Sequence, residues 1–420
     1  MTQELELVRL ANGVRVALDP MPGLGTAALG VYQRVGARWE SAEQNGIAHL
    51  FEHMAFKGAG GRDARQFAEA IESVGAAINA ATGYERTAYY ARTLAEHAPF
   101  ALGLIADILF SPHWDPDDLE KEKGVVEQER GEAHDAPDDR VFVLHQGALF
   151  PDQPLGRPVL GEQETLRAVG IDALVSFRDA HLSPERVVIS IAGAYNRSEV
   201  LDAVEARFGS LAAKPQRERA PAMVRAGAAR EQRKLEQAHL ALSWAGPAAG
   251  ADTAYAARLM TEILGGGMAS RLFQEVRESR GLVYAIDAFL DAYEDVGRLV
   301  VYAGCAAKNA VLVAEIVAAQ LELMARSGPT DSELARAKSV ARAQMMMGAE
   351  APSARVEARA GQVFLRDRLA PFGELQARIE AVSGEDVRNA ACAALEGPVC
   401  AAAIGPKAGL GALAKFEAQS

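Results

Sequence analysis

Cysteine is scarce in this sequence. Among 420 residues there are three, Cys305, Cys392 and Cys400, and none of them belongs to a CxxC pair. Three isolated cysteines exclude a disulfide framework of the kind that holds small secreted proteins together. A reducing compartment is the simplest interpretation.

Long hydrophobic runs are missing as well. The longest, residues 98–110, is interrupted by Asp107 and is far shorter than the roughly 20 residues that cross a bilayer. Residues 1–8 are acidic and alternate polar with apolar side chains, whereas an export signal has a basic start and an unbroken apolar stretch. We therefore expect no membrane insertion and a cytoplasmic location.

Basic residues are in the minority. The chain has 44 Lys and Arg against 56 Asp and Glu, and phosphate binding relies on an excess of Lys and Arg, so nucleic acid is not an expected partner. Hydrophobic residues at 49% and charged residues at 24% are ordinary for globular proteins and exclude a disordered chain. A length of 420 residues predicts two or more domains, each with its own core.

The first half of the chain begins with strands and continues with helices. An Asn12-Gly13 turn and a break rich in Pro and Gly separate three predicted strands. Hydrophobic spacing then predicts six helices, a hairpin and one buried strand. The predicted strands are residues 5–10, 14–18, 27–35 and 186–194, the hairpin is 76–94, and the helices are 43–56, 64–74, 99–110, 116–133, 171–181 and 198–208.

A similar order of elements returns in the second half. Residues 212–235 are crowded with Lys and Arg and lack apolar periodicity, which is typical of a linker. Beyond them we expect strands at 238–244, 284–292 and 297–305 and helices at 254–264, 271–278 and 310–325. The repeated order predicts a duplicated α+β unit, with domains at residues 1–211 and 236–420.

The most informative segment is the pentapeptide His-Leu-Phe-Glu-His at residues 49–53. On a helix, His49 and His53 fall within about 40° of each other on one face, and Glu52 lies beside them. Two imidazoles one turn apart can share a zinc ion, and a neighbouring carboxylate can take a proton from water activated by the metal. The alternative is a pair of surface histidines, but the largely apolar flanks of this helix indicate burial.

A catalytic zinc ion needs a third protein ligand and one open position. On the predicted helix 116–133, Glu122 and Glu129 share the face that carries Leu119 and Val126. Carboxylates on the inward face of a helix are costly unless they meet cations or hydrogen-bond donors. Either glutamate is therefore a candidate for the metal, and the other for orienting a histidine by a hydrogen bond. Ordinary salt bridges to Lys or Arg are the alternative for both.

The order HxxEH inverts the thermolysin-type HExxH, and essentially the whole chain resembles the pitrilysin-type inverzincin peptidases, closest to the β-subunit branch of bacterial and mitochondrial processing peptidases. The resemblance implies two similar domains, each a mostly antiparallel sheet covered by helices, as in duplicated processing-peptidase or LuxS-like metallohydrolase halves. It assigns one Zn2+ per chain to His49, His53 and Glu129, makes Glu52 the proton acceptor and makes Glu122 the residue that orients a ligating histidine. Residues 1–211 would be catalytic, and residues 236–420 an inactive domain that clamps substrate.

Further residues match this family outside the metal site. Asn79 and Ala80 lie in a segment that resembles the edge strand on which family members bind an extended substrate, and edge strands bind peptides through their backbone groups. Arg277 and Tyr284 match a pair that holds substrate carbonyl groups in the family, and both are plausible donors to a developing oxyanion. Gly266 belongs to a glycine run that resembles a loop contacting substrate. An ordinary hairpin, a surface Arg and a core Tyr are the alternatives.

One departure concerns specificity. Processing peptidases of this kind read an arginine near the cleavage site with two acidic residues; Asp139 matches the first of these positions, and Val143 occupies the second. The resemblance therefore does not carry an arginine preference over to this chain.

The implied activity is zinc-dependent endopeptidase cleavage of peptides or presequence-like segments inside a dimeric chamber. Family members of this length form dimers, so we expect a homodimer, with a heterodimer containing a zinc-free subunit as the alternative. A different class of function is a non-catalytic core or assembly subunit, as in respiratory complexes, although such subunits usually lose the metal residues that this chain retains.

Overall fold

Two mostly antiparallel sheets organise the chain, one in each of two units. The protein is seen in a computed structural model that describes residues 4–215 and 219–417. Unit 1 is Met1–Arg130, Arg157–Glu218 and Met346–Pro371, and unit 2 is Gly131–Gly156, Arg219–Met345 and Phe372–Ser420. Each unit thus combines segments that are far apart in the sequence, and each is described by itself.

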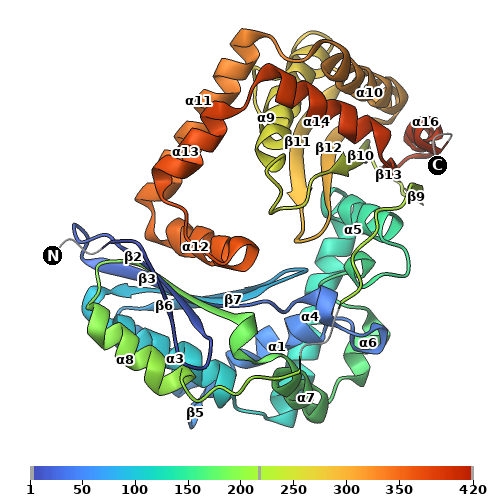
Figure 1. The fold of residues 1–420 in the computed structure, drawn as a ribbon. Helices are drawn as coiled ribbons and strands as arrows, with labels where there is room; N and C mark the ends of the chain where they lie inside the picture. Colours follow the sequence, from blue (N-terminus) through green and yellow to red (C-terminus); the bar gives the residue numbers. More distant parts are fainter. Residues whose placement is uncertain (1–3, 216–218, 418–420) are drawn as a thin grey trace. The chain divides into compact units, whose positions relative to one another are not determined.

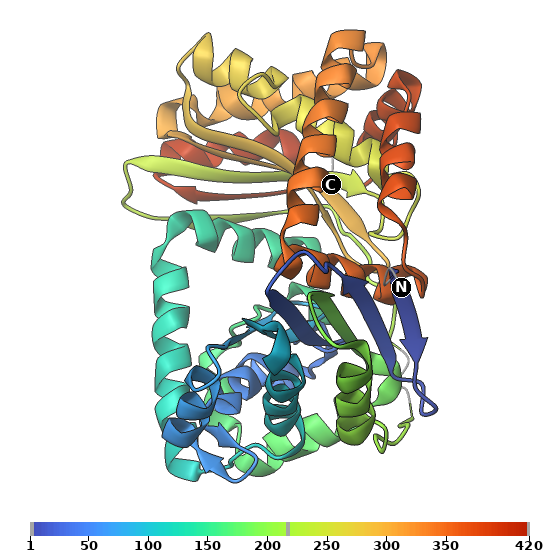
Figure 2. The same ribbon diagram turned by 90° about the vertical axis from the view of Figure 1, so that its left-hand side faces the viewer.

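The sheet of unit 1 has six strands in the order β1-β2-β8-β3-β7-β6 (Figure 1). All neighbours pair antiparallel except β2 and β8, and Figure 2 shows the green β8 beside blue strands from the beginning of the chain. Strand β6 ends the order, so it is an edge strand in the described part of the sheet. The strands are β1 Glu6–Arg9, β2 Arg15–Pro20, β3 Thr26–Gln33, β6 Ala77–Thr82, β7 Thr87–Leu94 and β8 Val187–Gly193.

Helices cover both faces of this sheet. The main core joins β3, β7 and β8 to α1, α3, α7 and α8 through buried side chains such as Leu50, Ile105 and Ile191. These helices are α1 Ile47–Ala55, α3 Ala98–Phe110, α7 Ile171–His181 and α8 Arg197–Phe208, and they are accompanied by α2 Ala64–Glu72, α6 Gln163–Ala168 and the short pair β4 Gly58–Ala59 and β5 Arg62–Asp63.

The opposite face of the same sheet receives α12, Pro352–Arg366, a helix from late in the sequence (Figure 1). Its buried Val356 and Val363 pack against Tyr32 and Val188 of the sheet. Buried Asp19 of β2 accepts a hydrogen bond from Arg359 Nε at 2.7 Å, and Arg355 reaches the same carboxylate at 2.8 Å. Apolar packing and these two ion pairs hold α12 on this face of the sheet.

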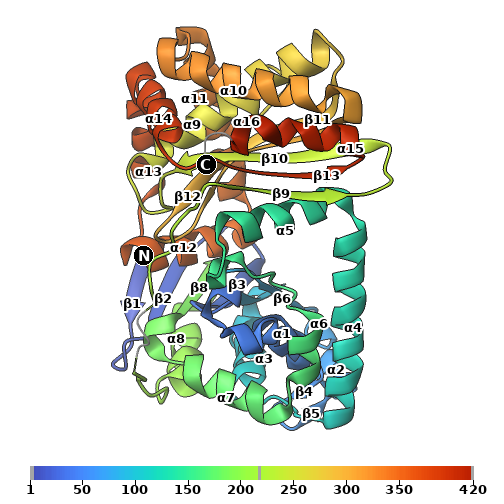
Figure 3. The same ribbon diagram turned by 90° about the vertical axis from the view of Figure 1, so that its right-hand side faces the viewer.

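Unit 2 has a five-stranded sheet in the order β11-β12-β10-β13-β9, in which only β13 and β9 pair in parallel. Figure 3 shows α5, Pro137–Leu149, on one face of this sheet and α10 and α14 on the other. Val141 of α5 is buried with Ala241, Ala402 and Ile404 of the sheet. The strands are β9 Gly227–Gln232, β10 Gln237–Gly246, β11 Val283–Ala292, β12 Gly297–Ala306 and β13 Cys400–Gly405, and the further helices are α9 Ala254–Gly265, α10 Ala310–Ser327, α13 Phe372–Ala381, α14 Gly384–Glu396, α15 Lys407–Leu410 and α16 Ala414–Glu417.

Two long helices pass from one unit into the other. Helix α4, Pro116–Asp135, begins in unit 1, and α11, Asp331–Glu350, begins in unit 2. Within the described ranges, no helix is both long enough and apolar enough to cross a membrane.

The predicted α+β class, with two mostly antiparallel sheets covered by helices, is confirmed. The helix predicted at 43–56 starts later, at Ile47, because Gly46 has a φ of 94°, which is outside the range of an α-helix. The segment predicted as a helix at 271–278 is helical, and its part Phe273–Glu278 is a π-helix.

The predicted division at residues 212–235 stays a prediction. The two units of the structure are each made of segments that are not continuous in sequence. Part of that segment forms the edge strand β9. Its charged residues Arg230 and Glu231 stand in parallel pairing with β13, and pairing through the backbone leaves no apolar period to recognise in the sequence.

Candidate metal centre and peptide edge

Helix α1 carries the two histidines and Glu52, and a buried carboxylate holds its first turn. Glu40 accepts hydrogen bonds from the backbone N–H groups of Gly46 and Ala48, both at 2.8 Å. The Asn45 side chain donates to the same carboxylate at 2.9 Å. Free N–H groups at a helix start need such acceptors, and the partial positive charge there favours a carboxylate. Burial raises the pKa of Glu40 to about 7 despite these donors.

The apolar side of α1 fixes which way its polar side faces. Ile47, Leu50 and Met54 are fully buried in the core of unit 1. His49 and His53 lie on the other side of the helix, with side chains 12% and 14% exposed. Their rings meet edge to face with centroids 4.6 Å apart. The spacing of four residues therefore places both imidazoles on one face, as predicted.

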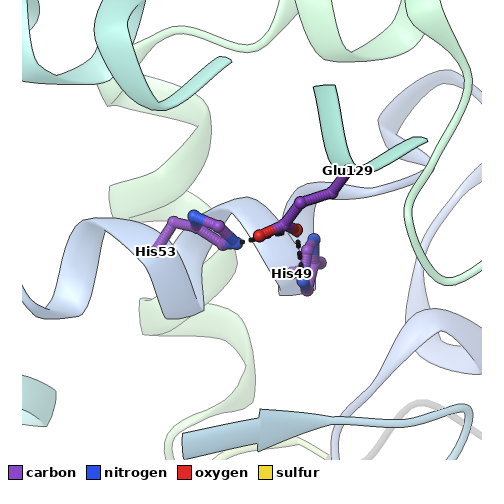
Figure 4. A group of neighbouring side chains, drawn as sticks. All are labelled: His49, His53 and Glu129. Carbon is purple, nitrogen blue, oxygen red and sulfur yellow. Dashed lines mark ion pairs between the residues drawn. The ribbon is translucent and has the colours of Figure 1, made fainter. Parts of the chain in front are cut away.

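Glu129 of α4 completes a group of three converging ligand atoms (Figure 4). Its Oε2 lies 3.4 Å from His53 Nε2 and 3.8 Å from His49 Nε2. One donor atom from each residue lies within 4.8 Å of the others. Two imidazoles and one carboxylate are one of the donor sets of catalytic zinc sites, which keep a fourth position open.

The protonation of His49 also suits a metal. Burial, together with the nearby His53, lowers the pKa of His49 to about 4. The imidazole is therefore neutral near pH 7, and a metal ion binds the neutral form. These residues fit a zinc ion both in the kind and in the position of their donor atoms.

Glu122 is not one of the three converging residues, but it contacts one of them, His53. Its Oε2 is 3.0 Å from His53 Nδ1, and its Oε1 is 2.5 Å from Nζ of Lys57. The Glu122 side chain is 8% exposed. A carboxylate on Nδ1 directs the other ring nitrogen of His53 toward Glu129, which is how ligating histidines are commonly oriented.

Glu52 faces the edge strand β6. The Thr82 hydroxyl, at the end of that strand, donates a short hydrogen bond to Glu52 Oε2. Burial raises the pKa of Glu52, and the Thr82 bond opposes that rise. A carboxylate whose pKa is raised toward neutrality is a better proton acceptor, and this one sits beside both the histidine face and the strand.

Strand β6 pairs with β7 on one side, with Ala80 opposite Tyr89. The Ala80 side chain is buried and Asn79 is exposed, so successive residues face opposite sides of the sheet. The Asn79 side-chain oxygen accepts a hydrogen bond from the Ala80 N–H at 2.9 Å. The predicted edge strand is thus present and ends next to Glu52.

The other predicted site residues belong to unit 2. Arg277 is exposed on the π-helix, with its guanidinium 4.8 Å from the ring centroid of Phe273. Tyr284, on β11, is 63% exposed, and Gly266 follows the last residue of α9. Asp139 is exposed on α5. Their joint action with the converging residues of unit 1 stays a prediction.

Three residues with a place in this site were not singled out from the sequence. Glu40 precedes an Asn-Gly pair at the start of the helix, Lys57 stands four positions after His53, and Thr82 ends the predicted edge strand. Lys57 lies beyond the last residue of α1, Ala55, and its contact with Glu122 joins it to another helix. The contacts of Glu40 and Thr82 depend on the three-dimensional fold, and no local pattern reveals them.

Comparisons with known proteins match most of the chain to one peptidase family. The profile of the insulinase family, peptidase family M16, matches residues 15–163, and that of the peptidase M16 inactive domain matches residues 168–340. An uncharacterized zinc protease of Bacillus subtilis is 36% identical over 384 residues, covering 90% of this chain and 93% of that protein. One of Mycobacterium bovis is 34% identical over 406 residues, covering 94% and 92%.

Solved structures show the same fold. A protease from Helicobacter pylori superposes with a TM-score of 0.87 at 20% identity, covering 96% of this chain and 99% of that one. A chain of complex III2 from Candida albicans gives 0.86 at 20% identity, covering 99% of both. The predicted resemblance is confirmed: the chain belongs to peptidase family M16, the insulinase and pitrilysin family of zinc proteases.

Proposed function

We propose that this chain is a zinc metalloendopeptidase that hydrolyses peptides bound in extended conformation. One observation carries the proposal: three ligand atoms converge beside a carboxylate that is hydrogen-bonded to the end of an edge strand. His49, His53 and Glu129 would hold one Zn2+ per chain, whose Lewis acidity, when it is bound, polarises a carbonyl group and acidifies water.

Glu52 would do the proton chemistry. Its carboxylate accepts a proton from the attacking water and then gives it to the leaving amine. The Thr82 hydroxyl donates a hydrogen bond to the Glu52 carboxylate and so helps to orient it for this transfer. Burial, which raises the pKa of Glu52, brings its basicity closer to the working pH.

Strand β6 would bind the substrate. The backbone of an edge strand offers N–H and C=O groups to an extended peptide, largely independent of the peptide sequence. Asn79 and Ala80 are the residues of this strand that we assign to substrate, and Gly266 is a further assigned contact. Arg277 and Tyr284 would donate hydrogen bonds to the carbonyl oxygen as its charge develops, and their exposure leaves both able to do so.

Asp139 is assigned to substrate side chains. Val143, four positions later on α5, offers no charge, so a preference for arginine would depend on Asp139 and on other acidic residues. We propose peptides or presequence-like segments as substrates, a dimer enclosing a chamber as the working form, and the cytoplasm as the location. A homodimer is the first expectation, and a heterodimer with a related zinc-free subunit is the alternative. Sedimentation of the purified chain distinguishes a monomer from either dimer.

A second candidate function is a non-catalytic core subunit of a larger assembly. This candidate comes from the fold that the protein shares, at 20% identity, with a chain of Candida albicans complex III2. Metal content separates the two functions, because a structural subunit needs no stoichiometric zinc.

The test of hydrolysis compares the wild type with Glu52→Gln on a mixed peptide library, with cleavage sites read by mass spectrometry. The variant should keep one zinc per chain and lose about 10²–10⁴-fold in turnover, because general-base catalysis contributes that much. Glu69→Gln is the matched control, since Glu69 pairs with Arg65 on the exposed surface of α2. Undiminished cleavage by Glu52→Gln would remove Glu52 from the mechanism, and no cleavage by the wild type would favour the core-subunit function.

A further inference from the structure

Lys57 lies within contact of the residues behind the metal centre. It follows the last turn of α1, where its backbone N–H donates to the Met54 carbonyl at 3.1 Å. Its ammonium group lies 2.5 Å from Glu122 Oε1, while the other oxygen of that carboxylate meets His53 Nδ1 at 3.0 Å. Lys57, Glu122 and His53 thus form a continuous chain of polar contacts that ends at a proposed ligand.

The buried Glu122 carboxylate needs a cation beside it, and Lys57 supplies that charge. Glu122 is buried, and an ionised carboxylate away from water is costly unless a cation compensates it. His53 does not compensate it as a ligand, because a histidine binds a metal ion as the neutral imidazole. Among the contacts that the structure gives for Glu122, the cation is Lys57.

The two histidines differ in this support. Nδ1 of His49 is buried and has no hydrogen-bond partner among residues 4–215 and 219–417. Its ring is held by packing on α1, whereas the orientation of the His53 ring depends on Glu122. Whatever fixes Glu122 therefore fixes the direction of one ligand nitrogen.

We infer that Lys57 is a positioning residue of the metal centre: it anchors Glu122, so that Glu122 holds His53 with Nε2 directed at the metal position. This inference rests on the proposed zinc site and adds to it a residue that touches neither metal nor substrate. An ammonium group makes this anchor by charge and by hydrogen bonding, so arginine should replace it better than any neutral side chain.

The test measures the zinc dissociation constant by competition with a chelating dye, independently of hydrolysis. Lys57→Met should raise this constant about tenfold, at the lower end of the 10–100-fold that residues behind metal ligands typically contribute. Lys57→Arg should restore most of the affinity. Lys121→Met is the matched control, because Lys121 is 71% exposed and pairs with Asp118 on the same helix that carries Glu122.

A double-mutant cycle shows whether Lys57 acts through Glu122. In the Glu122→Gln background, Lys57→Met should have no further effect on zinc affinity, because the anchored carboxylate is already gone. Additive effects, or an unchanged dissociation constant in Lys57→Met, would overturn the inference. Should Lys57→Met fail to fold, Lys57→Gln, which keeps a hydrogen-bond donor without the charge, takes its place in the cycle with the same expected outcomes.

These results stand apart from the proposed hydrolysis. A wild-type chain that binds zinc but cuts no peptide would overturn the peptidase proposal and leave the role of Lys57 supported or refuted by affinity alone. A wild-type chain that binds no zinc would overturn both.

Discussion

Glu52 and Thr82 come from different elements, a helix and an edge strand, and the Thr82 hydroxyl donates a hydrogen bond to the Glu52 carboxylate. This contact couples the proposed proton acceptor to the strand that would bind substrate. Because the carboxylate is mostly buried, its orientation depends on few partners, and Thr82 is the one that the strand supplies. Loss of this hydrogen bond should therefore impair the proposed proton transfer by Glu52.

Replacing Thr82 by Val should lower kcat about tenfold or more with little change in KM or zinc content, because hydrogen bonds to charged groups are worth about 1.5–3 kcal/mol. Thr82→Ser should recover most of the activity. Thr93→Val on β7 is the control, since the buried Thr93 hydroxyl has no partner in the described parts of the chain. Steady-state kinetics would contradict this role of Thr82 if kcat stayed at the wild-type value in Thr82→Val.

At the scale of single residues, the sequence predicts the converging group well. HxxEH spacing places His49 and His53 together on a helix face, and seven-residue spacing places Glu122 and Glu129 on one side of α4. The choice between the two glutamates came from the family resemblance. Helical spacing alone left it open, because both carboxylates face inward and the contact that separates them, Glu122 with His53, joins two helices.

At the scale of elements, α1 is held at its first turn by the Glu40 carboxylate. Burial raises the pKa of Glu40 to about 7, whereas an unfolded chain has a glutamate pKa of about 4.3. The folded state therefore binds the proton more tightly, so this contribution to stability is fully present below pH 4.3 and is lost as the pH rises through 7.

The pH dependence of unfolding tests this. The free energy of unfolding of the wild type relative to Glu40→Gln, from urea titrations of zinc-free protein, should fall between pH 5 and pH 8. Glu43→Gln is the control, because Glu43 is exposed three residues further along the chain. A difference that does not vary with pH in this range would show that Glu40 is ionised with an ordinary pKa.

Substrate binding along the edge strand β6 leads to a separate prediction. Backbone pairing uses the N–H groups of alternate residues, so methylating single amide nitrogens along a good peptide substrate should lower kcat/KM at every second position. Methyl groups placed on the neighbouring α-carbons serve as the control for bulk. A uniform response along the peptide would contradict binding by strand addition.

Hydrophobic spacing predicted most elements up to residue 325, but it predicted none of α5 and α6 and none of the elements beyond that residue, which include α11 to α14 and β13. Helix α7 was predicted with the bounds it has, Ile171–His181, because its apolar residues recur at helical spacing. Strand β9 was missed because it pairs through its backbone at a sheet edge. The π-helix at Phe273–Glu278 differs from an α-helix in hydrogen-bond register, which leaves nearly the same hydrophobic pattern.

At the scale of the whole molecule, each unit includes a helix that is separated in sequence from the rest of that unit. Unit 1 includes α12 from residues 346–371, and unit 2 includes α5 from residues 131–156. The repeated order of elements predicts a division at residues 212–235. Sequence order by itself does not show which sheet a helix covers. Because of this exchange, in which unit 1 takes α12 and unit 2 takes α5, neither half of the sequence contains all of one unit.

A cut at residue 211 should therefore not yield two independent domains. The fragment 1–211 lacks α12, and without it Ala17, Tyr32 and Val188 lose their apolar cover, so we expect a fragment that aggregates or unfolds at lower urea than the intact chain. Adding the peptide 346–371 should raise its stability, and a peptide with Arg359→Ala should do so less, because Arg359 bonds Asp19. A fragment 1–211 as stable as the full chain would contradict the exchange.

The central claim is that His49, His53 and Glu129 hold one zinc ion. It is tested most directly by X-ray diffraction from crystals of the zinc-loaded chain on both sides of the zinc absorption edge. One anomalous peak per chain is expected, lying between the two Nε2 atoms and the Glu129 carboxylate and absent in Glu129→Gln crystals grown at limiting zinc. A zinc-loaded chain with no peak there, or with its peak at other residues, would contradict it.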